Sequence, residues 1–138
     1  MLEGAIIGLI VGLTLAIIGF FIAARRKGTE WLSKMPARVS TLTVRAAPDT
    51  VYRAILAAKG DGKAEVDSTD DVMKRMVLTH KPSFWAGWGF FMPIHISAQG
   101  GGSEIKIGFT SRFIQKGPLV TRAHNAFTEA VKKIAEAA

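Results

Sequence analysis

A long uncharged apolar run near the start of the chain restricts its fold more than any other feature. Residues Gly4 to Ala24 contain no charged side chain and a single hydroxyl group, that of Thr14. A helix of this length is about 30 Å long, which matches the hydrocarbon core of a bilayer. A cleaved signal peptide fits less well, because the run is too long, Glu3 precedes it without any Lys or Arg, and residues 22–24 form a weak cleavage site. The sequence therefore predicts a transmembrane helix within residues 1–25.

Small residues recur along this run at nearly helical spacing. They are Gly4, Gly8, Gly12, Ala16, Gly19 and Ala23. Inside lipid, an apolar side chain gains nothing by leaving hydrocarbon, so helix association depends on the close approach of backbones that small residues permit. The spacing predicts a helix face that packs against another membrane helix. The alternative is the general abundance of glycine in membrane helices.

Basic residues follow the run directly and indicate its orientation. Arg25, Arg26 and Lys27 come after it, and only Glu3 precedes it. Because Lys and Arg favour the cytoplasmic side, we expect the N-terminus outside and the following domain in the cytoplasm, at the inner (plasma) membrane. The rest of the chain has 15 basic and 10 acidic side chains and no Cys. This balance suits anionic lipid headgroups as a partner and agrees with a reducing compartment.

The segment 26–37 is predicted to lie at the membrane interface. Thr29 to Met35 has the pattern of a short helical turn capped by Thr29 and ended by Pro36. Trp31 would then rest on the lipid. The alternative is a linker with one isolated Trp.

Residues 38–138 have the pattern of one small α+β domain. Expected strands cover 38–45, 63–67, 72–80, 89–98 and 104–114, with polar turn chemistry at 68–71. Expected helices begin at Pro48 and near Pro118. The order β-α-β-β-β-β-α predicts an antiparallel sheet packed against helices.

The sequence "APDTVYRAI" after the first strand, with Pro48, Val51 and Ile55, and the long C-terminal helix resemble the START-like or polyketide-cyclase-like helix-grip superfamily, in a reduced form. In that family the curved sheet and the last helix enclose a cavity for an apolar ligand, so the resemblance implies a lipid-like ligand. Half of a TATA-binding-protein-like fold fits the number of elements equally well.

The residues offer no catalytic constellation. Cys is absent, and no Ser lies in a G-x-S-x-G motif. His80 and His95 lie on neighbouring predicted strands and His124 on the last helix, but convergent metal ligands are not evident. We therefore expect no enzyme activity, no metal and no cofactor.

The segment from His80 to His95 is unusually aromatic. Phe84, Trp85 and Trp88 occur among Gly and Pro residues that disfavour a strand interior. We interpret this segment as an apolar loop that contacts the lipid headgroups or a partner protein. Trp suits such a boundary because its ring is apolar and its indole N–H can bond to water. The alternative is that one or two of these rings fill the core. Nucleic acid is not expected as a partner, because basic residues are scattered and a membrane anchor precedes the domain.

Taken together, these patterns predict a non-catalytic, single-pass accessory subunit that docks on larger membrane protein subunits of a transporter, respiratory or secretion assembly. The alternative is a membrane-tethered carrier or sensor of a lipid-like hydrophobic ligand.

Overall fold

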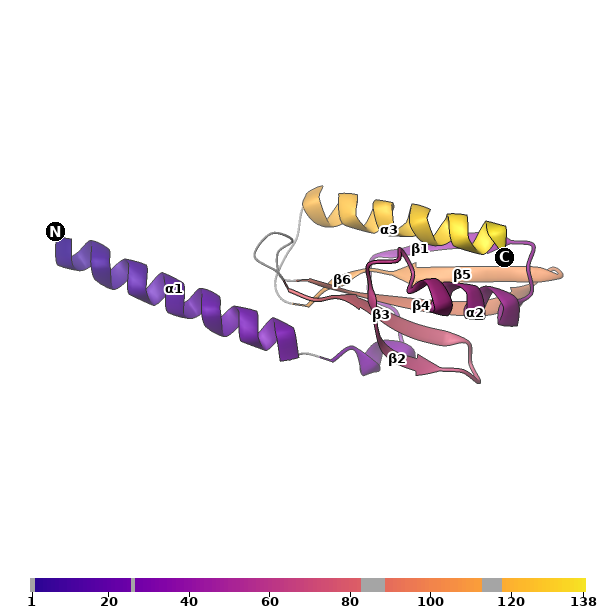
Figure 1. Cartoon of the computed structure of the whole chain (residues 1–138), viewed down its shortest axis with the longest axis horizontal. Coiled ribbons are helices and arrows are strands. Elements are labelled where there is room, and N and C mark those ends of the chain that lie inside the picture. Colours follow the sequence, from indigo (N-terminus) through magenta and orange to yellow (C-terminus); the bar gives the residue numbers. More distant parts are fainter. Residues whose placement is uncertain (1, 26, 83–88, 113–117) are drawn as a thin grey trace.

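The computed structural model describes residues 2–25, 27–82, 89–112 and 118–138, except for the side chains of Ala23 and Ala24 (Figure 1). The helices are α1 (Leu2–Arg25), the short 3-10 helix η1 (Thr29–Leu32), α2 (Pro48–Ala58) and α3 (Pro118–Ala137). The strands are β1 (Val39–Val44), β2 (Glu65–Asp70), β3 (Arg75–His80), β4 (Phe90–Gln99), β5 (Gly102–Gly108) and β6 (Thr110–Ser111). An α+β fold with an antiparallel sheet and an apolar N-terminal helix is therefore confirmed.

Helix α1 extends away from the folded domain (Figure 1). Its segment Leu2–Ile22 has a mean hydropathy of 2.8. By length and composition, this segment is long and apolar enough to cross a membrane. Large apolar side chains are exposed on it throughout, with Leu9 at 71% and Leu15 at 63%. Among its described side chains and glycines, only Gly19 is buried.

The sheet has the strand order β1-β5-β4-β3-β2, and β6 pairs with the beginning of β4. Helices α2 and α3 pack on one face, which we call the inner face. Its alternate strand residues are buried, as expected for a half-buried sheet. The main core residues are Val51, Ile55, Met76, Leu78, Phe90, Met92, Ile94, Ile105, Ile107, Phe109, Phe127 and Val131.

The turn predicted at residues 68–71 is wrong. Strand β2 continues to Asp70, and its residues Ser68 to Asp70 pair with β3. The turn follows at residues 71–74, where the Asp70 carboxylate accepts a hydrogen bond from Met73 N–H and Lys74 has φ 56°. The polar residues Ser68 to Asp70, which are typical of turns, are tolerated in this strand because β2 lies at the edge of the sheet and its outer side faces solvent.

The strand predicted from Glu104 to Ile114 is divided. Strand β5 ends at Gly108, Phe109 N–H donates to the carbonyl of Arg38, and β6 pairs with β4 opposite Phe90 and Phe91. A Cβ at Gly108 would lie 2.7 Å from Pro36 Cδ. The break therefore occurs where another segment of the chain crosses the sheet closely. Ile114 lies outside the described residues.

Candidate functional site

Residues Gly28–Pro36, which we call the strap, cross the sheet face opposite α2 and α3. Helix η1 contacts β2, β3 and β4. At the beginning of the strap, a Cβ on Gly28 would lie 2.7 Å from the Phe91 ring and 3.0 Å from Val77 Cγ1. The predicted helical turn exists as a 3-10 helix, but Gly28 and not Thr29 occupies its N-cap position, and no side chain caps it. The segment expected at the lipid surface thus packs, at least in part, on the domain.

Polar groups of the sheet hold the strap. Gly28 N–H donates to Asp67 Oδ2 at 3.1 Å, and Arg75 Nη1 donates to the Leu32 carbonyl at 3.0 Å. His95 Nε2 lies 2.8 Å from the Trp31 carbonyl, so the proton of the neutral ring is on Nε2. Burial lowers the pKa of His95. These bonds supply partners that a single helical turn cannot supply for itself.

The outer face beneath the strap is buried. Val77 and Phe91 are 0% exposed, and Thr79 and Arg112 are nearly so. Arg112 Nη1 donates to Thr79 Oγ1 at 2.6 Å, and its guanidinium carbon lies 4.5 Å from the centroid of the Phe91 ring. Phe91 is therefore held between a guanidinium group and the strap. Sequence reasoning missed this surface, since the residues that meet there are remote along the chain.

The strap fixes the domain close to the end of α1. Only Arg26 and Lys27 separate the last helical residue, Arg25, from Gly28. A chain of this length spans at most about 10 Å. The beginning of the strap, seated on Phe91, thus lies within about 10 Å of the helix end, and Figure 1 shows α1 leaving from one end of the domain.

The predicted packing face of α1 is open along its first four small positions. Gly4, Gly8, Gly12 and Ala16 are exposed, and a Cβ built on each of the three glycines meets no atom within 4 Å. Gly19 is buried. At 3.6 residues per turn, the small positions cover an arc of about 120°. The side chain of Ala23 lies outside the described residues.

The predicted interface residues have different surroundings. Arg25 is exposed, with its guanidinium 5.9 Å from the Phe21 ring, and Lys27 is exposed. Trp31 is half-buried, and the Lys34 ammonium lies 5.1 Å from its ring. The remaining predicted interface residues, Arg26, Phe84, Trp85 and Trp88, lie outside the described residues.

The histidines do not converge. His80 is opposite Phe90 and His95 is opposite Arg75, and the two histidines point to opposite faces of the sheet. His80 Nε2 lies 2.9 Å from Asp61 Oδ2. Within the described ranges, no three His, Asp or Glu side chains are placed to hold a metal ion.

Aromatic rings occupy the space between α3 and the sheet. Phe109 lies 4.5 Å from Phe90 and stacks on His124 at 5.2 Å, measured between ring centroids. His124 Nε2 is 3.0 Å from Ser40 Oγ, and burial lowers the pKa of His124. Phe127 lies 6.4 Å from Phe109. This part of the interior is therefore filled by side chains.

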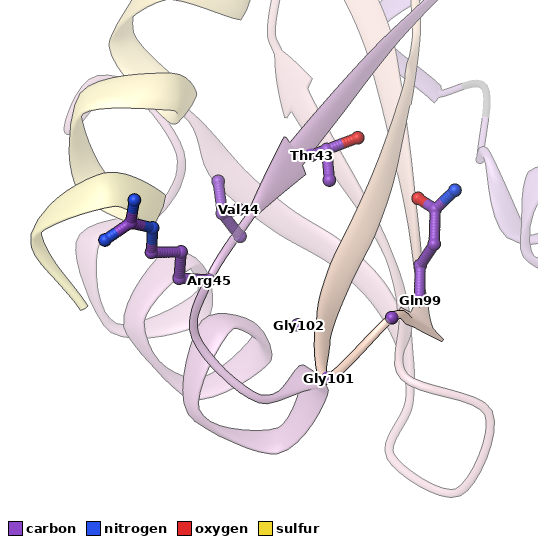
Figure 2. Close-up of a pocket in the computed structure, with 7 residues that line it drawn as sticks. Thr43, Val44, Arg45, Gln99, Gly101 and Gly102 are labelled. Carbon is purple, nitrogen blue, oxygen red and sulfur yellow. The ribbon is translucent and has the colours of Figure 1, made fainter.

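Clefts that the described residues form are open to solvent. One of about 340 Å³ lies between the end of β1 and the β4–β5 hairpin, and Figure 2 shows Arg45 extending toward α3, away from Gln99. A second cleft, of about 320 Å³, lies between the end of β1 with Arg45 and the C-terminal end of α3. Figure 1 shows the β4–β5 hairpin and the C-terminal end of α3, which contribute to these clefts, at the end of the domain away from α1. A third, of about 300 Å³, is lined by Lys63, His80, Lys81, Gly89 and Phe90.

Comparison with known proteins identifies the fold but not a family. No model of a protein family and no curated protein matches the chain. Among solved structures, Ara h 8.0201 superimposes with a TM-score of 0.57 at 13% identity, over 72% of this chain and 93% of its own. Aha1 from Colwellia psychrerythraea superimposes with a TM-score of 0.55 at 9% identity, over 72% of this chain and 93% of the Aha1 chain.

DynU16, a putative protein of the dynemicin biosynthetic locus, gives a TM-score of 0.52 at 14% identity over 71% of this chain. The match spans only 45% of DynU16. All three structures have helix-grip folds, so the resemblance of the sequence to that superfamily is confirmed for the fold of the domain. At such low identities the likeness shows the fold alone.

Proposed function

We propose that this protein is a non-catalytic, single-pass accessory subunit of a membrane protein complex. In this proposal α1 crosses the bilayer and packs on a larger membrane subunit, and the helix-grip domain lies on the cytoplasmic side. The observation that carries the proposal is α1 itself. It is apolar on all sides, exposed in the structure from Leu2 to Ile18, and open at its small residues Gly4, Gly8 and Gly12.

The exposure of α1 demands an apolar environment. A helix that is hydrophobic all round is stable only when it is buried, either in protein or in lipid. The described part of the domain leaves most of α1 exposed, so lipid and a partner helix are the surroundings that we infer for it. A signal sequence has a similar composition. An intact-mass measurement of the membrane-extracted protein separates the two, since a cleaved signal removes the mass of α1.

The short connection supports a docking role. A long flexible linker lets a domain sample a wide volume, whereas the strap ties Gly28 to Asp67 and seats it on Phe91. A helix docked on a partner would thereby place the domain against the same partner. The proposal does not specify whether the complex is a transporter, a respiratory assembly or a secretion assembly.

Substitutions on the open face test the proposal. Gly8→Ile and Gly12→Ile add bulk at positions where an added Cβ would meet no atom of the described domain within 4 Å, so we attribute an effect on association to a partner outside the chain. We expect both to release membrane proteins that copurify with the wild type in mild detergent, while membrane insertion is retained. Leu9→Ile is the matched control. Equal retention of partners by all three variants would contradict docking through this face.

A second candidate is a membrane-tethered carrier or sensor of a lipid-like ligand. It is favoured by the helix-grip fold and by the cleft beside Phe90, where Lys63 and Lys81 lie next to an apolar ring. Mass spectrometry of lipids retained by the purified full-length protein tests it. A stoichiometric lipid that remains with Gly8→Ile would favour the carrier over the subunit.

A further inference from the structure

An exposed surface of mixed basic and apolar character lies where β1 begins and α3 begins. We call its residues Arg38, Leu119 and Arg122 the basic rim. Leu119 is 59% exposed, and both arginines are exposed. Arg38 Nη1 donates to Thr121 Oγ1 at 3.0 Å, which joins the two elements.

The basic rim has no acidic counterpart in the described structure. Neither Arg38 nor Arg122 forms an ion pair with any described residue. The first turn of α3 has no acidic residue, and the first acidic residue along that helix is Glu129. The N-terminal end of the helix dipole adds further positive potential beside Leu119.

The basic rim lies at the same end of the domain as the membrane helix. Figure 1 shows that α3 begins at the end from which α1 leaves. The beginning of β1 is near the same end, because Phe109 N–H, just before β6, donates to the Arg38 carbonyl. The strap holds this arrangement, since Gly28 is fixed to the sheet.

We propose that the basic rim rests on the anionic surface of the bilayer that α1 spans. Arg38 and Arg122 bind lipid phosphates, and Leu119 enters the boundary between headgroups and acyl chains. Guanidinium groups bind phosphate oxygens in a bidentate manner, and basic residues near a membrane are attracted by its negative surface potential. An apolar residue among basic ones is the pattern of an interfacial contact. This proposal rests on the proposed membrane span of α1.

A fluorescent probe on the full-length protein tests this contact. Because the chain has no Cys, Leu119→Cys carries a single environment-sensitive probe, and Val72→Cys, 88% exposed in the β2–β3 turn, is the control. Both proteins are reconstituted into nanodiscs of phosphatidylcholine, with or without one third phosphatidylglycerol. We expect a blue shift and quenching by bromolipids for the Leu119 probe in anionic discs, and neither change for the Val72 probe.

Charge variants complete the test. Arg38→Glu with Arg122→Glu should abolish the shift, whereas Lys132→Glu with Lys133→Glu, the same charge change near the other end of α3, should preserve it. A Leu119 probe without any shift, or with equal shifts in both lipid mixtures, would overturn the contact with anionic lipid. Extraction of the wild-type protein from membranes by alkaline carbonate would instead overturn the span of α1.

Discussion

Gly28→Ala is the most direct perturbation of the strap. At Gly28 φ is −102° and ψ is 16°, a conformation open to alanine, so backbone strain does not contribute. The added Cβ would lie 2.7 Å from Phe91 Cδ1 and 3.0 Å from Val77 Cγ1. Phe91 is fully buried under the Arg112 guanidinium and has little room to move. The strap must therefore shift outward.

The magnitude follows from two opposing effects. Overpacking of this kind costs typically about 1–3 kcal/mol, while replacement of Gly by Ala restricts the unfolded chain and returns about 0.4–1 kcal/mol. We expect a net loss of about 1–2 kcal/mol in the free energy of unfolding. Full release of the strap would re-expose Val77 and Phe91 and cost about 3–6 kcal/mol, which sets the upper bound.

The assay is the denaturant midpoint of the full-length protein in detergent micelles, followed by near-ultraviolet circular dichroism. Gly12→Ala is the control, because a Cβ there meets no atom of the chain within 4 Å. Phe91→Leu combined with Gly28→Ala should cost at least about 0.5 kcal/mol less than the sum of the single changes. A midpoint of Gly28→Ala equal to or above that of the wild type would refute the seating of the strap on the sheet.

Three further predictions follow from other parts of the chain. A Val72→Cys protein should be shielded from a membrane-impermeant thiol reagent in intact cells and labelled after lysis; labelling in intact cells would reverse the proposed orientation. Burial lowers the pKa of His124 below 6.5, so the unfolded state binds more protons as the pH falls below about 6.5. Stability should therefore decrease between pH 7 and pH 5, and His124→Gln should reduce this dependence of the denaturant midpoint, to which the lowered pKa of His95 also contributes. Trp85→Ala and Trp88→Ala should change the free energy of unfolding by less than about 1 kcal/mol while weakening membrane or partner association; a loss of about 3–5 kcal/mol would place both rings in the core.

The sequence alone determined the features that depend on neighbours along the chain. Helix α1 follows from an uninterrupted apolar run, and α2 follows from Pro48 at its first position and apolar residues at helical spacing. The buried stripe of α3 was predicted from the same periodicity through Val120, Phe127 and Val131. Such patterns are local, since a helix hydrogen-bonds within itself and shows its period in a few turns.

Only the tertiary structure decided how these elements meet. The strap lies on the sheet because Gly28 reaches Asp67 and Trp31 reaches His95, pairs separated by 39 and 64 positions. The strand predicted from Glu104 to Ile114 divides at Gly108, where Pro36 lies close to the sheet. Neither event leaves a periodic signal, since each depends on the shape of a surface assembled from distant segments. A short polar or small residue in the sequence does not indicate which remote backbone will approach it.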